Sequence, residues 1–308
     1  MFFDIAKNAL LYYNKNEVNA MEENFSYYYV DNQILFRHCL IVNPPKEAYT
    51  PHSHKICELL LFKKGNVRYI TRGRQYQLKE NDLIFSRPFE IHDIQPSAGV
   101  PYERYNILFD EKTLPFDIWS KFPENTDIIN IRNLPSVLAL FEKLDYYTKR
   151  LEGAELKLVL TALVQEIFVN IMMEMKSAKE ENDYVQTNDI VCRAISYMEE
   201  NLTTLSGMEE VASALFITKS HLHHLFVRHM GITPKKYILT KRLAMAHREI
   251  SAGGKPTEVY RFCGFADYSA FYRAYRTHFK KSPSDKVTNA TITLGDITDS
   301  VRGGSVEL

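Results

Sequence analysis

The chain has 308 residues, of which 45% are hydrophobic and 25% charged, and its formal net charge is zero. This composition excludes an intrinsically disordered protein, and the length suffices for two domains with separate cores. No apolar run approaches the roughly 20 residues of a membrane span, and Met1-Phe2-Phe3-Asp4 does not resemble the start of a signal peptide. We therefore expect a cytoplasmic protein that does not contact membranes.

The four cysteines are widely scattered along the chain and form no CxxC pair. Zinc knuckles bring cysteines together in such pairs, so the spacing argues against one. Reduced thiols are the ordinary state of isolated cysteines in the cytoplasm. We expect reduced thiols at Cys39, Cys57, Cys192 and Cys263.

The segment 25–110 is typical of β structure. Short apolar runs alternate with turn signals such as Lys64-Gly65-Asn66 and Arg72-Gly73-Arg74. Many short strands at close spacing indicate a sandwich or a small barrel. The clearest strand candidates are 34–36, 59–62, 67–70 and 82–85.

Two helices are expected after the strands. Apolar residues repeat at three-to-four spacing over 134–144, and a longer apolar stripe runs over 156–175. The long stripe must be buried, either against the barrel or in a dimer interface. Because the stripe is wide, we expect both roles, and hence a homodimer.

The rest of the chain divides at a polar, non-periodic stretch that we interpret as a linker. Beyond it the pattern is helical to about residue 287, and the final residues have little apolar content, which is typical of a mobile tail. The predicted fold class is α+β. We expect a sensing domain over 1–130, dimerisation helices over 131–176, a linker over 177–186, an all-α domain over 187–288 and a tail over 289–308.

The zero net charge hides an uneven distribution. Residues 187–288 contain 15 lysines and arginines, nine acidic residues and six of the ten histidines. Residues 1–186 contain 22 basic and 26 acidic side chains. A basic domain favours a polyanionic partner, although the excess here is moderate.

The basic domain contains an internal repeat. Residues 218–229 align with 267–278 at an offset of 49 residues, and each copy begins with an N-cap type, Thr218 or Asp267. At helical spacing, one face of each copy is apolar and the opposite face is polar. The apolar positions are Leu222, Leu225 and Phe226 in the first copy, and Phe271, Ala274 and Tyr275 in the second.

Each repeat has the layout of a helix-turn-helix motif. A short helix precedes each copy, over 208–215 and 257–263, with a tight turn between. The segment 234–250 separates the two motifs and predicts a rod of roughly 26 Å at 1.5 Å per residue. That length is compatible with placing two recognition helices in successive major grooves, which are about 34 Å apart.

The segment from about Asp189 to Val287 resembles the DNA-binding domain of the AraC/XylS family of bacterial regulators. The stretches that carry the resemblance are 208–212, 220–226 with Gly231, and 264–273 with His278-Phe279 and Ser282-Pro283. The resemblance implies a double helix-turn-helix domain that binds double-stranded DNA. It places base-reading residues at Ser220, His223 and His224, and at Tyr268, Ser269, Tyr272 and Arg273.

Arg273 is the strongest candidate, because its guanidinium can bond O6 and N7 of guanine together. We expect phosphate contacts from Lys219, Arg228, Lys241, Arg242 and Arg276. A polar helix face is most often merely solvated. The doubled motif, the caps and the local charge favour DNA binding here.

A second constellation lies in the N-terminal half. His52, His54 and Glu58 alternate onto one face if they share a strand, and His92 can join them across the barrel. The pattern His-x-His-x3-Glu, with a later histidine, resembles the cupin family over roughly 30–110. A cupin beside an AraC-type domain implies a sensor. We expect a small polar effector, such as a sugar or another metabolite, bound by His52, His54, Glu58, Tyr69, Arg72 and His92.

Two other interpretations of the histidines remain open. They can be hydrogen-bonded within the barrel wall, or they can hold a divalent metal ion, as in a metal-dependent cupin enzyme. We rank the metal-free effector site first, the structural role second and the metal third, and so expect no cofactor. No P-loop, dinucleotide fingerprint or catalytic triad supports another enzyme class.

The sequence therefore predicts a ligand-responsive transcription regulator that is not an enzyme. RNA polymerase is a further expected partner of an activator. A module that binds only proteins is disfavoured by the charge of 187–288. The effector, the operator and the choice between activation and repression stay open.

Overall fold

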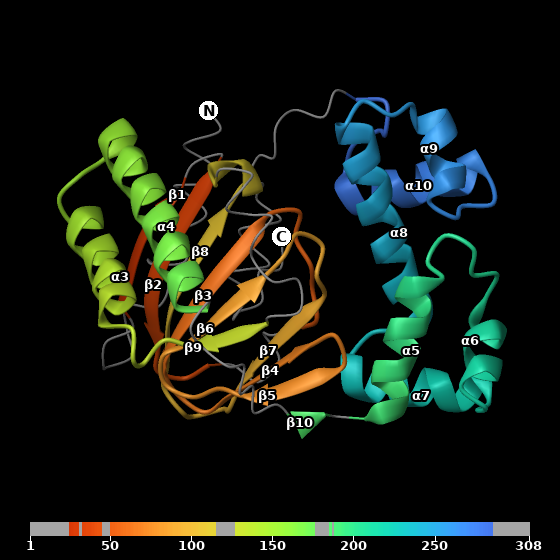
Figure 1. The fold of residues 1–308 in the computed structure, drawn as a ribbon, viewed down its shortest axis with the longest axis horizontal. Helices are drawn as coiled ribbons and strands as arrows, with labels where there is room; N and C mark the ends of the chain where they lie inside the picture. The colour runs from red at the N-terminus through yellow and green to blue at the C-terminus, as the bar shows by residue number, and fades with distance from the viewer. Residues whose placement is uncertain are drawn as a thin grey trace.

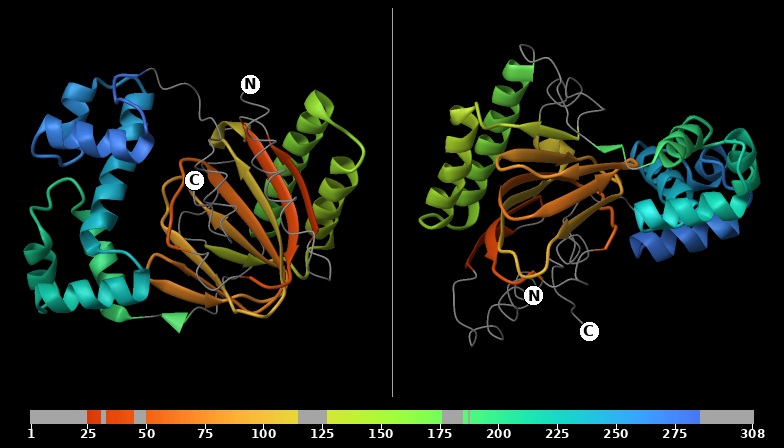
Figure 2. Two further views of the ribbon diagram at one scale, coloured as in Figure 1. Left: turned by 180° about the vertical axis from the view of Figure 1, so that it is seen from behind. Right: turned by 90° about the horizontal axis from the view of Figure 1, so that it is seen from below.

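A computed structural model describes residues 25–30, 33–44, 50–114, 127–175, 185–186 and 188–285. The expectations for the tail over 289–308 and for most of the linker lie outside these residues. Figures 1 and 2 show a β domain, flanked on one side by two helices, beside a separate group of helices.

The β domain consists of two antiparallel sheets. The larger has the order β1-β2-β8-β3-β6-β9, and the smaller has the order β10-β5-β4-β7. The strands are β1 (Phe25–Val30), β2 (Ile34–Ile41), β3 (Cys57–Lys64), β4 (Val67–Thr71), β5 (Arg74–Gln77), β6 (Asp82–Ser86), β7 (His92–Pro96), β8 (Tyr102–Phe109), β9 (Ile128–Asn130) and β10 (Val185–Gln186). All four strand candidates coincide with observed strands. The short β10 belongs to the predicted linker and pairs with β5.

The strand β3 shows why the larger sheet is central. Successive side chains of a strand point to opposite faces, and both faces of β3 are buried. Leu59 and Leu61 join the cluster under the helices, whereas Leu60 and Phe62 join the cluster between the sheets. The uninterrupted apolar run of β3 therefore serves two cores.

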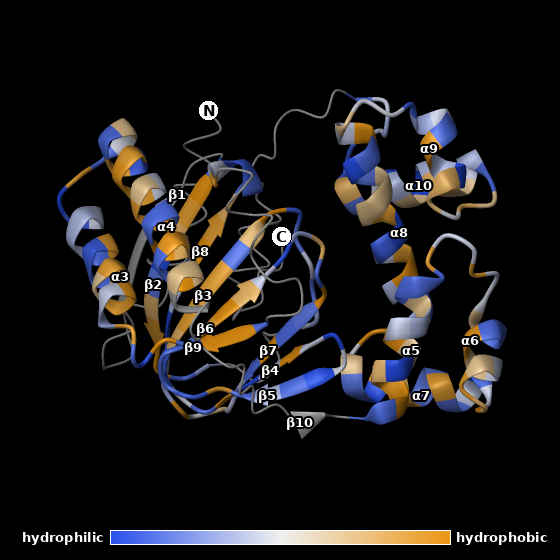
Figure 3. Cartoon of the chain, viewed as in Figure 1, coloured by the Kyte–Doolittle hydropathy of each residue, from blue (hydrophilic) through white to orange (hydrophobic). Residues whose placement is uncertain are grey.

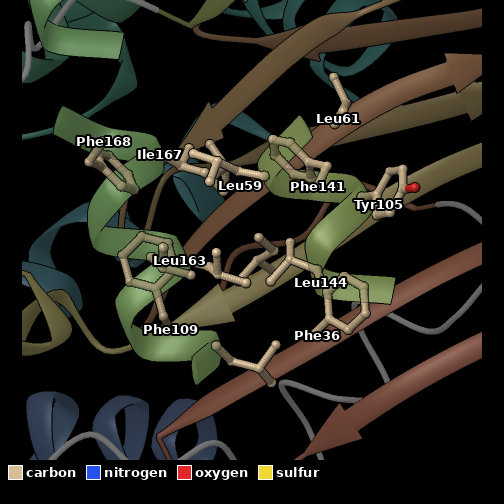
Figure 4. Packing of buried hydrophobic residues seen from close by; sticks show 14 of the residues in the cluster. Phe36, Leu59, Leu61, Tyr105, Phe109, Phe141, Leu144, Leu163, Ile167 and Phe168 are labelled. Atoms are coloured by element: carbon tan, nitrogen blue, oxygen red, sulfur yellow. The ribbon is translucent and has the colours of Figure 1, made fainter. Parts of the chain in front are cut away.

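The helices α3 (Pro135–Thr148) and α4 (Gly153–Met175) cover the outer face of the larger sheet (Figure 1). Figure 4 shows their apolar side chains against those of the strands, with the Phe168 ring 5.6 Å from the Phe109 ring. Both helices are striped with apolar and polar residues in Figure 3. The apolar cluster between these two helices and the larger sheet contains Phe36, Leu59, Leu61, Tyr105, Phe109, Phe141, Leu144, Leu163, Ile167 and Phe168.

The helix α4 departs from the expectation that no apolar stretch approaches the length of a membrane span. The stretch Gly153–Met173 is long and apolar enough to cross a membrane by length and composition alone. Its apolarity has a local cause, because Leu160, Val164 and Ile167 are fully buried against the sheet. Leu158, Val169 and Met173 are 72%, 38% and 66% exposed, so α4 also carries apolar side chains that the sheet does not cover. Dimerisation through these helices stays a prediction.

Over the described residues 188–285, the regular elements of the C-terminal half are all helices. It comprises α5 (Asp189–Glu200), α6 (Met208–Ala214), α7 (Lys219–Met230), α8 (Pro234–Ser251), α9 (Pro256–Phe262) and α10 (Tyr268–Phe279). One core lies between α5, α6, α7 and the first half of α8, and another between the second half of α8, α9 and α10. The expected fold class is confirmed: a strand-rich N-terminal domain and a helical C-terminal domain.

Candidate functional site

The two predicted helix-turn-helix motifs are α6–α7 and α9–α10. The Thr218 hydroxyl accepts a hydrogen bond from the His221 amide, and the Asp267 carboxylate accepts one from the Ala270 amide. These caps start both recognition helices at the positions predicted from the repeat. Gly231 ends α7 with a φ of +67°, a left-handed conformation that glycine adopts without strain.

The apolar and polar faces of both recognition helices are as expected. Leu222, Phe226, Phe271 and Tyr275 are buried, so each helix is anchored to its own core. α7 and α10 run in nearly parallel directions at opposite ends of α8 (Figure 2). The exposed side chains include those of Lys219, Ser220, His223, His224 and Arg228 on α7, and of Ser269, Arg273 and Arg276 on α10.

Two predicted base-reading residues, Tyr268 and Tyr272, are only half exposed. The Tyr268 ring lies 5.6 Å from that of Tyr260 and 5.9 Å from that of Phe271. Tyr260, on α9, therefore packs in the core of the second motif.

In the first motif, the Lys219 ammonium of α7 forms an ion pair with Glu209 of α6.

The sequence analysis missed residues at the start of α8. Thr233 and Lys235 line the same groove as Ser220, His223 and His224 of α7. The Thr233 hydroxyl accepts a hydrogen bond from the Lys236 amide, and Pro234 occupies the first turn of α8. The sequence signal for a helix start at this place was the capping residue Thr233 followed by Pro234, directly after the end of α7.

Lys241 and Arg242, on α8, do not belong to the exposed faces of α7 and α10. The Lys241 ammonium contacts Glu90 of the β domain and Glu199 of α5. The Arg242 guanidinium donates to the backbone carbonyls of Leu202 and Leu205. Both side chains have partners inside the protein, and the expectation that they contact phosphates is not supported.

The β domain brings four of the predicted ligand-binding residues together. The Nε2 atoms of His54 and His92 each lie 3.0 Å from Oε2 of Glu58, and the His52 ring lies 4.5 Å from the His92 ring. The four residues form what we call the histidine cluster. His54, Glu58 and His92 are buried.

One expectation about this cluster was wrong in detail. Residues 52–56 do not continue the strand β3, which begins at Cys57. His52 instead forms an isolated bridge with His92, with two backbone hydrogen bonds of 3.0 Å. The residues converge because β7 approaches the start of β3, not because they alternate along one strand.

Backbone carbonyls fix the orientation of the three imidazoles. The Nδ1 atoms of His52, His54 and His92 lie 2.9, 2.7 and 2.9 Å from the carbonyl oxygens of Thr50, Ile56 and Glu90. A neutral imidazole that donates from Nδ1 has a lone pair on Nε2. These contacts orient the rings so that the Nε2 atoms of His54 and His92 face Glu58.

Burial sets the charges in the cluster. Burial, together with the neighbouring His92 and His54, lowers the pKa of His52 to about 3, so this imidazole is neutral at pH 7. Burial alone would raise the pKa of Glu58. The neighbouring His54 and His92 imidazoles outweigh burial and keep the pKa of Glu58 well below its usual range. The cluster therefore presents a carboxylate and a neutral imidazole to an occupant.

The other two predicted ligand-binding residues lie differently. The Tyr69 ring is 6.1 Å from the His92 ring, and its hydroxyl hydrogen-bonds with that of Ser86, so Tyr69 borders the cluster. Arg72 lies in the turn between β4 and β5 and contacts Glu90 and Asp127. It faces the helical domain and does not belong to the cluster.

The donor set fits a divalent metal ion. The histidine ligand atoms all lie within 4.8 Å of one another. Donors bound to one ion at about 2.0–2.2 Å are about 3–3.5 Å apart, so the imidazoles would close around an ion by up to about 1–2 Å. Histidine ligands commonly donate their second ring nitrogen to a carbonyl, as all three do here. Over the described residues, His52, His54 and His92 are the group of side chains close enough together to share a metal ion.

Comparison with known proteins agrees with the arrangement of a strand-rich domain followed by a helical domain. The model of a helix-turn-helix domain matches residues 211–288, and the model of the AraC-like ligand-binding domain matches residues 38–143. The chain belongs to the AraC family. Like other AraC-family proteins, it is a DNA-binding transcription regulator with a ligand-binding domain.

The AraC-family relatives include two named regulators. The chain is 37% identical over 90 residues to the probable transcriptional regulator LumQ of Photobacterium leiognathi, covering 29% of this chain and 36% of LumQ. It is 22% identical over 255 residues to the transcriptional activator RhaS of Escherichia fergusonii, covering 78% of this chain and 88% of RhaS. ToxT from Vibrio cholerae is similar to 85% of the chain, with 13% identity and a TM-score of 0.34.

Proposed function

We propose that this AraC-family chain reads a DNA operator through the exposed faces of α7 and α10. Ser220, His223 and His224 contact base edges in one major groove. Tyr268, Ser269, Tyr272 and Arg273 contact those of the next. The proposal rests on one observation: two capped recognition helices at opposite ends of a single rod, α8, expose matching polar faces.

The phosphate contacts come from the flanks of the same helices. Lys219, Arg228 and Arg276 are exposed next to the proposed base-reading positions. Lys235 extends this set, because it lines the groove beside α7. Such cations set the register of the protein on the duplex without reading sequence.

The histidine cluster binds the effector in this proposal. A buried carboxylate surrounded by imidazoles offers acceptors and donors to a small polar molecule, such as a sugar or another metabolite, and Tyr69 forms an aromatic wall. Binding there shifts the population of DNA-competent molecules.

A second candidate ligand is a divalent metal ion, favoured by the 3.0 Å spacing of His54 and His92 Nε2 from Glu58 Oε2. His52, His54, Glu58 and His92 would hold the ion, which would supply a fixed positive charge at the barrel. Metal analysis of the purified chain tests this second candidate: about one ion per chain supports the metal, and a trace amount contradicts it.

The remaining parts of the proposal concern assembly and location. The exposed apolar residues of α4 form a homodimer interface, with Leu158 and Met173 in contact across it. The regulator acts in the cytoplasm, engages RNA polymerase as an activator and has no catalytic activity of its own.

Genome-wide capture of DNA bound to the full-length chain tests the proposed function. We expect recurrent sites with two half-motifs about one helical turn apart. The genes beside those sites then narrow the choice of effector. Recovery of fragments without a shared sequence would contradict the proposal.

A further inference from the structure

An ion-pair network lies between the β domain and the helical domain. The Lys241 ammonium on α8 is 3.1 Å from Oε2 of Glu90 and 2.9 Å from Oε1 of Glu199. Arg72 approaches the same Glu90 oxygen at 3.5 Å, and the Tyr237 hydroxyl donates to Glu199. The Glu90 and Lys241 side chains are only 9% and 16% exposed, so solvent screens this pair weakly.

Apolar contacts surround this network. Ile70 and Ile91 of the β domain belong to the same buried cluster as Val191 and Ile195 of α5. The ring of Phe89 lies 5.7 Å from that of His247 on α8 and 5.9 Å from that of Phe279 on α10. The segment 87–92 therefore shares a core with α5 through Ile91 and lies against α8 and α10 through Phe89.

The same segment is bound to the histidine cluster through its backbone. The Phe89 amide donates to the His54 carbonyl at 2.7 Å, and His92 Nδ1 lies 2.9 Å from the Glu90 carbonyl. Phe89 has a φ of +63°, a conformation that is uncommon outside glycine and that the surrounding bonds must maintain. Movement of His54 or His92 on ligand binding therefore acts directly on the backbone of Phe89 and Glu90.

We propose that Glu90 and Lys241 are positioning residues that couple the histidine cluster to the DNA-binding helices. An occupant that displaces His92 shifts Glu90, weakens its contact with Lys241 and loosens α8 from the β domain. The inference rests on the proposed function of the histidine cluster as the effector site. It adds the path by which occupancy reaches α7 and α10.

A double-mutant cycle in the full-length chain tests the coupling without any ligand. His92→Gln removes the Nδ1 contact with the Glu90 carbonyl, and Lys241→Met removes the charge while keeping a similar apolar stem. Hydrogen exchange of the amides of α8 and the radius of gyration report the loosening, and the melting midpoint controls for folding. Glu80→Gln, at an exposed position of the β domain, is the matched control for Glu90→Gln.

We expect His92→Gln to speed exchange in α8 by roughly tenfold in the wild-type background and to add little in the Lys241→Met background. Glu90→Gln should loosen α8 similarly, Glu80→Gln should not, and Lys241→Arg should largely restore protection. Additive effects of His92→Gln and Lys241→Met, or a Glu90→Gln chain as protected as the Glu80→Gln control, would overturn the proposal. Because the cycle uses no effector, failure to find an effector leaves its result intact.

Discussion

Nζ of Lys241 on α8 lies 3.1 Å from Oε2 of Glu90 in the β domain. Burial lowers the pKa of Lys241, but Glu90 and Glu199 outweigh burial and raise it, so the ammonium stays charged at neutral pH. A lysine in a basic, DNA-binding domain is thus used to join that domain to the sensor. This contact places the sensor next to the rod that carries both recognition helices.

Replacing Arg273 with Ala should weaken operator binding by about 1–3 kcal/mol and relax the preference at one base position. We assign the exposed Arg273 side chain on α10 to a guanine edge, which its guanidinium would bond at two points. Binding to a panel of single-base operator variants measures the effect. Arg132→Ala removes the same charge from the β domain and should leave affinity unchanged; an Arg273→Ala variant with the wild-type base profile would refute the assignment.

Replacing Arg276 with Ala should weaken binding to all sequences about equally. We assign this exposed side chain to a phosphate, so its loss should reduce the slope of log affinity against log salt by about 1. Titrations at several salt concentrations, on operator and on unrelated DNA, provide the measurement. A loss confined to the operator would instead identify Arg276 as a base contact.

His247 predicts an acid sensitivity of the folded chain. Burial, then the charges of Lys55, Lys281 and His278, lower the pKa of His247 from 6.5 to about 4. Between pH 6.5 and 4 the unfolded chain binds a proton that the folded chain does not, so this contribution to stability is present above pH 6.5 and is lost as pH falls. The change is at most on the order of 1 kcal/mol per pH unit.

A comparison of melting midpoints at pH 7 and pH 5 tests this prediction. The wild-type chain should lose more stability on acidification than the His247→Gln variant. His223→Gln is the matched control, because His223 is exposed on α7. Equal losses in the wild-type and His247→Gln chains would show that His247 does not carry the effect.

Divalent ions provide a test of the histidine cluster. If Zn²⁺ or Ni²⁺ is the ligand, either should raise the melting midpoint of the wild-type chain, because a ligand that binds only the folded state stabilises it. His54→Ala, His92→Ala and Glu58→Gln should each abolish the shift. A shift that persists in all three variants would place the ion elsewhere, and the exposed pair His223 and His224 would then be examined by the same substitutions.

Much of the helical domain could be predicted from the sequence because its signals are local. Thr218 and Asp267 mark the starts of α7 and α10, and the apolar repeat at Leu222, Phe226, Phe271 and Tyr275 marks the buried faces. Caps and helical periodicity act within one or two turns. They are therefore readable without knowledge of the rest of the fold.

The interdomain contacts could not be predicted in this way. Glu90 and Lys241 are 151 residues apart in the chain, and no local sequence pattern at either residue indicates its partner. Arg72 was assigned to the effector site by its residue type, whereas the turn between β4 and β5 directs it towards Glu90 and Asp127. The convergence of His52 with His92 depends on the approach of β7 to residue 52, and the assumption of a single strand did not capture it.

The affinity of the purified chain for a captured promoter fragment, compared with a shuffled fragment of the same composition, tests the central claim most directly. At low ionic strength, our account predicts a preference of at least about a thousandfold for the promoter fragment, since α7 and α10 read two successive grooves. Equal affinity for the two fragments, with and without added metabolites, would contradict it.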